Sequence, residues 1–388
     1  MAESKSTERI PELDGLRGFA VLAVVLWHYF YFFPAQSDRP TGFLRAAHAW
    51  FERSIATGWS GVDLFFVLSG FLIGGILLDA RESPRYFKTF YLRRFYRIIP
   101  IYYLWISWYI ILSLSAKPLL SAIWPELAMP WSWREMLGRF LFLQNLGFIG
   151  ASAGAFVWLA PTWSLAVEEQ FYLVAPLAIR FLSKRNLYAA LCTAIVGAPL
   201  LRVFVSRGLA TPLTLDPAYV LMPCRADALA IGVFAAMLWR EPRMQVWMRS
   251  RGQILTGFSV ILLAGVVALT RWSPNSNSLS MRSVGYTWFA LFYGSTLLLV
   301  VSRRAGIVAR LARMKWLREL GRVSYCVYLI HEVVKLFCGA AVHAAVGNTA
   351  RTDLATSLIA GAVTYALARV SWVYFENPLL RRGHSYRY

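Results

Sequence analysis

Residues 16–33 read LRGFAVLAVVLWHYFYFF, an apolar run of the length that crosses a bilayer. About 20 residues suffice for a transmembrane helix, because each adds about 1.5 Å and the hydrocarbon core is about 30 Å thick. The run carries one charged residue, Arg17, near its start and one imidazole, His28, deep inside it. No small-residue cleavage site follows it, so we interpret the run as a retained membrane helix and not as a signal peptide.

Arg17 and His28 are 11 residues apart, which is close to three helical turns, so both side chains project from the same face. The helical rise places His28 roughly 16 Å further into the membrane than Arg17. An ionisable group at that depth is costly and by default marks a reaction or transport site. The structural alternative is an arginine that extends to the headgroups and a buried histidine that hydrogen-bonds a neighbouring helix. These two residues alone leave both interpretations open.

The composition of the whole chain is that of an integral membrane protein. Of 388 residues, 58% are hydrophobic and 15% are charged, which is too little charge to cover the surface of a soluble domain of this size. The formal net charge is +20, but the basic residues lie in short loops between apolar runs and not on one compact face. We therefore exclude a nucleic-acid partner and interpret the basic clusters as topology signals, with phosphate binding as a second role.

Apolar runs recur along the chain and predict an all-α membrane protein, a bundle of about ten transmembrane helices in a single domain, 1–388. The longest connection, about 118–160, contains MLGRFLFLQNLGFI, which we expect to lie at the interface or to re-enter the membrane. Lysine and arginine are concentrated in alternate loops, which predicts that both termini, the tails 1–15 and 377–388, are cytoplasmic. The predicted spans are 16–34, 60–79, 98–115, 163–182, 187–205, 225–239, 254–270, 285–301, 323–347 and 355–376.

Three arginines, Arg93, Arg94 and Arg97, precede Pro100 in YLRRFYRIIPIYYL, at the predicted cytoplasmic mouth of the third span. Guanidinium groups spaced over about one helical turn can bind a phosphate at several points, since each offers a planar fork of donors. The structural alternative is an ordinary positive-inside cluster.

A carboxylate lies at a matching depth in the fourth span, within PTWSLAVEEQFYLVAPL. Glu168 lies about 7.5 Å into this span from its outer side, and His28, counted from the inner side, reaches a similar level. The two suit an acid–base pair in which Glu168 orients and charges the imidazole. Glu169 is the neighbouring candidate, on a face rotated by about 100°. The structural alternative is a salt bridge from either glutamate to Arg225 or Arg202.

Further polar residues lie within or beside the predicted spans. His331 lies about 14 Å inside the ninth span, and Asp63 is near the outer end of the second, where several glycines permit close helix contact. We expect Glu376, near the inner end of the tenth span, to be an ion-pair partner of the cytoplasmic arginines and not a catalyst. The complete set of further candidates is Asp14, Asp63, Glu169, Arg225, Asp227, Ser324, Tyr328, His331 and Glu376.

The sequence contains no P-loop, no GxGxxG and no metal-ligand spacing, which argues against ATP-driven or metal-assisted chemistry. Seven segments in order, from residue 11 to about 380, resemble motifs of the membrane-bound acyltransferase family 3, the type that O-acetylates bacterial O-antigen and other surface glycans. These segments are PELDGLRGFAVLAVVLWHYF, GVDLFFVLSGFLI, RRFYRIIP, PTWSLAVEEQFY, RADALAIG, GRVSYCVYLIH and YFENP.

The resemblance implies an acyltransferase of the bacterial cytoplasmic membrane. Its donor is expected to be cytoplasmic acyl-CoA, above all acetyl-CoA, and its acceptor a sugar hydroxyl on a lipid-linked or exported glycan. By position, the resemblance implies His28 as the catalytic residue with Arg17 as its essential partner, Arg94 and Arg97 as donor-binding residues, and Glu168 as the carboxylate of the W-S-L-x-x-E element. Because the chain ends soon after the tenth span, we expect it to lack the extracytoplasmic esterase-like domain that some members append.

The hypothesis that joins both lines of reasoning is acyl transfer with His28 as general base on the acceptor hydroxyl. Glu168 stabilises the imidazolium, the arginines hold the phosphates of the donor, and Tyr328 or Ser324 steadies the oxyanion. A covalent acyl-histidine relay stays open. The alternative from another class is a proton-coupled transporter of a polar solute, with His28, Glu168, His331 and Asp63 as the proton relay. An acyltransferase that modifies a small glycosylated molecule is the third reading.

Overall fold

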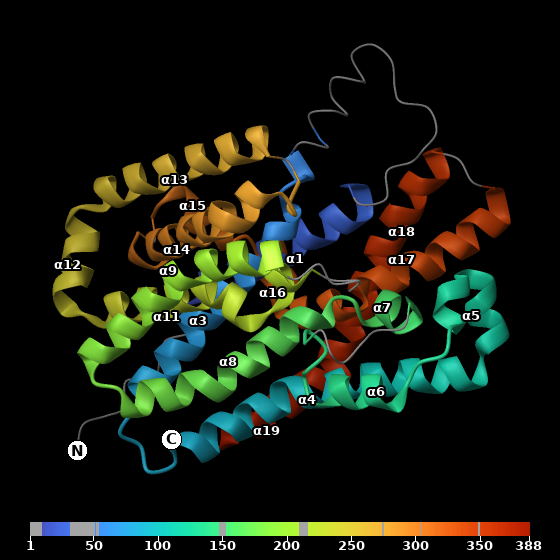
Figure 1. Ribbon diagram of the computed structural model, residues 1–388, viewed down its shortest axis with the longest axis horizontal. Coiled ribbons are helices and arrows are strands. Elements are labelled where there is room, and N and C mark those ends of the chain that lie inside the picture. Colours follow the sequence, from blue (N-terminus) through green and yellow to red (C-terminus); the bar gives the residue numbers. More distant parts are fainter. Residues whose placement is uncertain are drawn as a thin grey trace.

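The computed structural model describes residues 10–31, 51, 54–146, 153–208, 216–273, 275–303, 305–347 and 350–388. It is 87% helical, and no strand occurs within these described ranges. In this part of the chain, nine helical segments are long and apolar enough to cross a membrane. The predicted all-α, multi-pass membrane fold is therefore confirmed, and Figure 1 shows its long helices as one bundle.

The nine segments follow the chain in order. They are α1 (Pro11–Leu26) with η1 (Trp27–Tyr31), η2 (Gly58–Ser60) with α3 (Gly61–Asp79), α4 (Tyr86–Ser115), α9 (Lys184–Gly208), α10 (Pro217–Val220) with α11 (Met222–Arg240), α13 (Gly252–Trp272), η5 (Met281–Gly285) with α14 (Tyr286–Ser302), α17 (Ser324–Val346), and α18 (Ala350–Ser371) with η6 (Trp372–Glu376) and α19 (Asn377–Ser385). In Figure 1, α13 and α4 lie on opposite sides of the bundle.

Two details of the predicted spans differ from the structure. The expected fourth span forms α8 (Thr162–Phe181), which is long enough to cross a membrane but is not among the nine, because Glu168 and Glu169 lower its hydropathy. The third span begins at Tyr86 and not near residue 98, so the three arginines lie on the helix and Pro100 lies inside it. Long arginine side chains let a helix continue beyond its apolar part, because the guanidinium can extend away from the hydrocarbon.

The loops predicted to be cytoplasmic meet at one end of the bundle. Arg81 donates to the carbonyl of Leu182 at 2.7 Å, and the Nζ of Lys184 lies 2.6 Å from Glu241. α19 lies along the first half of α4, the arrangement seen at the lower left of Figure 1. This is expected if successive spans run in alternate directions through the membrane. That this end of the bundle faces the cytoplasm stays a prediction.

Glycines bring two pairs of helices into very close contact. A Cβ on Gly18 of α1 would lie 2.0 Å from the carbonyl oxygen of Leu317 in α16 (Lys315–Arg322). Likewise, a Cβ on Gly70 of α3 would lie 2.1 Å from the carbonyl oxygen of Leu229 in α11. The expected packing role of the small residues in the second span is thus confirmed, since only glycine permits this approach.

Two buried arginines bind aspartates in the same half of the bundle. Arg225 forms an ion pair with Asp63, and both side chains are almost completely buried. Arg202 lies 3.0 Å from Asp227, with both also buried. The expected alternative, in which these arginines bind the glutamates of α8, is therefore wrong. Asp63, Arg225 and Asp227 hold helices α3, α9 and α11 together, because a buried charge is tolerated only with a partner.

The long connection forms α5 (Lys117–Ile123), η3 (Pro125–Ala128), α6 (Trp133–Phe140) and α7 (Ala153–Leu159), while 147–152 lie outside the described residues. After α6 the chain enters the bundle. Asn145 is only 3% exposed and donates to the carbonyl of Val220 at 3.1 Å. Gln144 donates to the carbonyl of Thr162 at 2.7 Å. These amides attach the segment after α6 to the helices of the bundle, and its expected re-entry into the membrane stays a prediction.

Candidate active site

His28 lies where α1 changes its hydrogen bonding. The helix is regular up to Leu26, and the next five residues, Trp27–Tyr31, form a π-helical turn of which His28 is the second. Such turns are rare and occur frequently at functional sites. The change of pitch turns His28 toward α17, where two ionisable side chains meet it.

The imidazole of His28 forms an acid–base cluster with α17. Its Nε2 lies 2.9 Å from Oε1 of Glu332, and its Nδ1 lies 3.3 Å from Nε2 of His331. The His28 and Glu332 side chains are each 20% exposed, whereas that of His331 is completely buried. His28 and Glu332 can therefore meet a substrate, while His331 lies behind them.

The main-chain contacts of the two rings assign their tautomers. His331 Nδ1 lies 2.8 Å from the carbonyl oxygen of Tyr328, so Nδ1 carries the proton and Nε2 is an acceptor. His28 Nδ1 faces that acceptor and also lies 2.9 Å from the carbonyl oxygen of Val24, so it donates. The nitrogen of His28 that exchanges a proton with Glu332 or a substrate is consequently Nε2.

The expected pairing of Glu168 with His28 is wrong. The two oxygens of Glu168 accept from the hydroxyls of Ser69, at 2.8 Å, and Tyr172, at 2.9 Å. Counting residues along a helix predicts how deep a side chain lies but not which side chain it contacts. Because α17 packs against α1, Glu332 is the carboxylate beside His28. Sequence analysis missed Glu332, although it directly follows His331, and a His–Glu pair inside an apolar span is the signal that could have found it.

A second cluster gathers guanidinium groups from α1 and α4. The charge of Arg17 acts on Glu168 and on Arg94, and the charge of Arg97 acts on the same carboxylate and on both arginines. Arg94 also lies over the ring of Tyr172, 6.0 Å from its centroid. Three like charges so close together favour an anion between them, since guanidinium groups bind phosphate at several points.

The third arginine of the predicted trio does not join this cluster. Arg93 donates to the main-chain carbonyl of Tyr386 at 2.6 Å and lies over the ring of Tyr388. It fastens the C-terminal segment to α4. Asp14 lies 3.6 Å from Arg17 on the same helix. Glu376 accepts from the hydroxyl of Ser371 at 3.0 Å, and among the described residues it forms no ion pair with an arginine, contrary to expectation.

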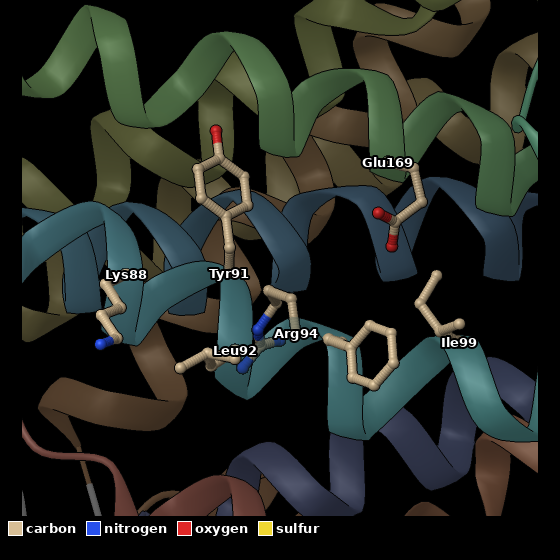
Figure 2. A pocket seen from close by; sticks show the side chains of 7 residues that line it. Lys88, Tyr91, Leu92, Arg94, Ile99 and Glu169 are labelled. Atoms are coloured by element: carbon tan, nitrogen blue, oxygen red, sulfur yellow. The ribbon is translucent and has the colours of Figure 1, made fainter.

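A cavity of about 460 Å³ opens between α4 and α8 beside the arginine cluster. Figure 2 shows Tyr91 of α4 and Glu169 of α8 reaching across the space between the helices. Oε1 of Glu169 is buried and has no hydrogen-bond partner within the described chain, and the same holds for Nε of Arg94. Glu169 thus faces this cavity and not His28.

Of the two candidates for the oxyanion, only Tyr328 lies beside a histidine. The hydroxyl of Tyr328 lies 2.8 Å from that of Ser164, and the Tyr328 ring is 6.0 Å from that of His331. Ser324 donates to the carbonyl of Gly321 at 2.9 Å.

His28, His331 and Glu332 also have the residue types of a metal site, with potential ligand atoms within 4.8 Å of one another. The 2.9 Å between His28 and Glu332 is a hydrogen-bond distance, however, and is shorter than the roughly 3.3–3.6 Å between two ligand atoms held tetrahedrally at about 2.0–2.2 Å from one zinc ion. We interpret the three side chains as an acid–base group.

Comparison with known proteins shows to which family the chain belongs. The model of the acyltransferase 3 family, described as an acyltransferase domain, matches residues 10–373. The chain belongs to this family. The matched range includes the arginine cluster as well as His28 and Glu332, so the predicted resemblance is confirmed over nearly the whole chain. No solved structure matches the chain.

Curated relatives of this family member include bacterial O-acetyltransferases. Peptidoglycan O-acetyltransferase OatA of Listeria monocytogenes is 28% identical over 390 residues, which cover 97% of this chain and 57% of that protein. O-acetyltransferase OatA of Staphylococcus aureus is 25% identical over 398 residues, which cover 97% of this chain and 58% of that protein. The chain thus spans a little over half of the length of these relatives.

Proposed function

We propose that this membrane protein transfers an acetyl group from acetyl-CoA to a sugar hydroxyl of a cell-envelope glycan. The observation that carries the proposal is the pairing of two sites along α1. An arginine cluster suited to the phosphates of the donor lies near Arg17, and an acid–base cluster suited to a hydroxyl lies at His28, roughly 16 Å further along the helix. Membership of an acyltransferase family supports the class of reaction.

The donor is expected to bind with its phosphates at the arginine cluster. Arg94 and Arg97 are the principal ligands, and the cavity beside Glu169 gives this cluster an opening between α4 and α8. The extended pantetheine arm then carries the thioester along α1 toward His28. This arrangement uses the binding energy of a remote group to position the reacting carbonyl.

At His28 the reaction is a direct acyl transfer. The acceptor hydroxyl takes the place of Glu332 at Nε2, which accepts the hydroxyl proton while the hydroxyl oxygen attacks the thioester carbonyl. The carbon–sulfur bond then breaks, and the departing thiolate takes the proton from the imidazolium. Glu332 stabilises the imidazolium between these two steps, and His331 keeps Nδ1 of His28 in its donor form.

For the acceptor we propose a glycan of the peptidoglycan class, or its lipid-linked precursor in the cytoplasmic membrane. The names of the two relatives support an O-acetyltransferase, and that of the Listeria monocytogenes protein supports peptidoglycan. The O-antigen type of acceptor expected from the family resemblance has no comparable support among these relatives.

The test is acetyl transfer from radiolabelled acetyl-CoA in membranes that contain the protein, with the label followed into glycan, lipid and small-molecule fractions. Replacing His28 with Ala is expected to lower the rate by about 10²–10⁴. His343→Ala is the matched control, because His343 lies on α17 but pairs with Asp353 at 3.2 Å. Near-normal transfer by His28→Ala would remove this residue from the chemistry, and label confined to small molecules would overturn the glycan acceptor.

The transporter reading has no observation in its favour. Of the four residues of the expected proton relay, Asp63 is bound to Arg225 and Glu168 to Ser69 and Tyr172. Only His28 and His331 are in contact. A relay needs hydrogen-bonded neighbours along its whole length, and the described residues do not provide it between these four groups.

A further inference from the structure

We propose that Lys335 is a positioning residue for His28: its ammonium group binds the main-chain carbonyls of the π-helical turn and so fixes the direction of the imidazole. The inference rests on the proposed function of His28 as the general base. Lys335 acts on the main chain that carries the imidazole and not on the reacting atoms.

The contacts of Lys335 with the turn are direct. Its Nζ lies 2.5 Å from the carbonyl oxygen of Tyr29 and 3.3 Å from that of His28. The ammonium also lies 5.2 Å from the centroid of the Tyr29 ring. Charge-assisted hydrogen bonds of this kind are stronger than neutral ones. A single cation therefore holds two successive carbonyls of the turn that carries the catalytic ring.

Other side chains complete the attachment of the same turn. Ser357 of α18 donates to the carbonyl of Tyr29 at 3.1 Å. The hydroxyl of Tyr29 donates to the main-chain carbonyl of His331 at 2.8 Å and lies 3.0 Å from the side-chain hydroxyl of Thr364. The turn is thus attached to both α17 and α18, and Lys335 adds charge-assisted hydrogen bonds to these neutral ones.

The place of Lys335 in α17 argues against a lysine that extends to the membrane surface. It is the middle residue of Ser324–Val346, 11 residues or roughly 16 Å from either end, which is further than its side chain can reach. A cation in such a position is costly unless it has a specific partner. Asp353 of α18 acts on it electrostatically but forms its own contact with His343.

Helical spacing explains how α17 alone contacts both ring nitrogens of His28 and the main chain that carries the ring. Lys335 follows Glu332 by three residues and His331 by four, so the three side chains share one face of α17. Glu332 contacts Nε2 of His28 and His331 contacts Nδ1. Lys335 binds the main-chain carbonyl of His28 itself. If the carbonyls were released, the turn could revert to regular α-helical bonding, and Nε2 would rotate away from Glu332.

The experiment compares steady-state kinetics of the full chain in membranes. Lys335→Met keeps the length of the side chain and removes the charge, and we expect kcat to fall about 30-fold, because misplacement of a catalytic group by about 1 Å costs up to 10²-fold. KM for acetyl-CoA should stay within about twofold, since the arginine cluster is untouched. Lys335→Arg can still donate to both carbonyls, and its kcat should be about 10-fold higher than that of Lys335→Met, or roughly a third of the wild-type value.

Arg81→Met is the matched control. Arg81 is also a cation that binds main-chain carbonyls at the end of a helix, those of Arg180 and Leu182, but at the opposite end of the bundle from His28. Its removal should leave kcat unchanged. Ser357→Ala, which removes one neutral donor from the same turn, should lower kcat about threefold and provides the test if Lys335→Met does not fold.

The outcomes separate this inference from the proposed function. A wild-type chain that transfers no acetyl group would overturn the proposed function, whatever the variants do. With an active wild type, a normal kcat in Lys335→Met, a change confined to KM, or an arginine variant as impaired as the methionine variant would each overturn the positioning role. A fall in kcat with arginine recovery and an unchanged KM supports it.

Discussion

The two ring nitrogens of His28 have different partners, and this difference sets the direction of proton transfer. Nδ1 is held as a donor by Val24 and His331, while Nε2 meets Glu332. A histidine with one nitrogen held in this way presents the other as its base. The chemistry assigned to His28 therefore depends on one carboxylate, and that carboxylate can be tested alone.

Replacing Glu332 with Gln keeps the shape of the side chain and removes the charge that stabilises the imidazolium. We expect kcat for acetyl transfer to fall about 10- to 100-fold, with KM for acetyl-CoA nearly unchanged. Glu168→Gln is the comparison, because Glu168 binds Ser69 and Tyr172 beside the arginines. The Glu168→Gln variant should alter KM for acetyl-CoA more than it alters kcat. The reverse pattern, with the larger loss of kcat in Glu168→Gln, would restore Glu168 as the partner of His28.

Among the elements, α4 carries neighbouring arginines with different tasks. Arg94 and Arg97 face the cluster with Arg17, while Arg93, within the same turn, holds the C-terminal segment. Sequence spacing cannot separate them, because all three could reach a common phosphate. The contacts with Tyr386 and Tyr388 make the distinction.

Replacing Arg94 or Arg97 with Gln is expected to raise KM for acetyl-CoA about tenfold, since a hydrogen bond to a charged group contributes about 1.5–3 kcal/mol. Acetyl-pantetheine, which lacks the nucleotide phosphates, should be used almost equally well by the variants and the wild type. Arg93→Gln is the internal control, and its KM should stay normal. An equal effect of all three variants on KM would mean that the cluster acts only through its general charge.

For the molecule as a whole, the close contact of α3 and α11 fixes the frame that holds the sites. Gly70 and Gly232 lie at this crossing, where a Cβ on Gly232 would meet the carbonyl oxygen of Val67 at 2.2 Å. Main-chain atoms cannot move aside as flexible side chains can. Any larger residue at this point therefore separates the two helices.

Gly70→Val should consequently reduce the yield of folded protein and lower its thermal unfolding temperature, because overpacking costs about 1–3 kcal/mol or more. Size-exclusion chromatography in detergent and a thermal melt would measure both effects. Gly197→Ala on α9 is the control, since a Cβ at Gly197 has nothing within 4 Å. Equal stability of the two variants would contradict the close contact.

Much of the fold could be predicted because each span is recognisable from its own residues. Nine of the ten expected spans are helices apolar enough to cross a membrane, and the remaining one, the expected fourth span, forms α8. The start of α4 was predicted 12 residues too late, because its first turns are basic and read as a loop. His28, Arg17, Arg94 and Arg97 could be singled out because charged or ionisable groups in or beside apolar runs stand out, and their roles stay predictions.

The sequence by itself determined that this chain crosses the membrane many times and where its costly polar groups lie, because hydropathy and helical spacing are properties of local segments. Only the tertiary structure decided which of those groups meet. His28 and Glu332 are about 300 residues apart and come together because α17 packs against α1, whereas Glu168, at the matching depth, is held by Ser69 of α3. Depth in a bilayer follows from counting residues along one helix, but contact between side chains depends on which helices are neighbours and on how each is rotated.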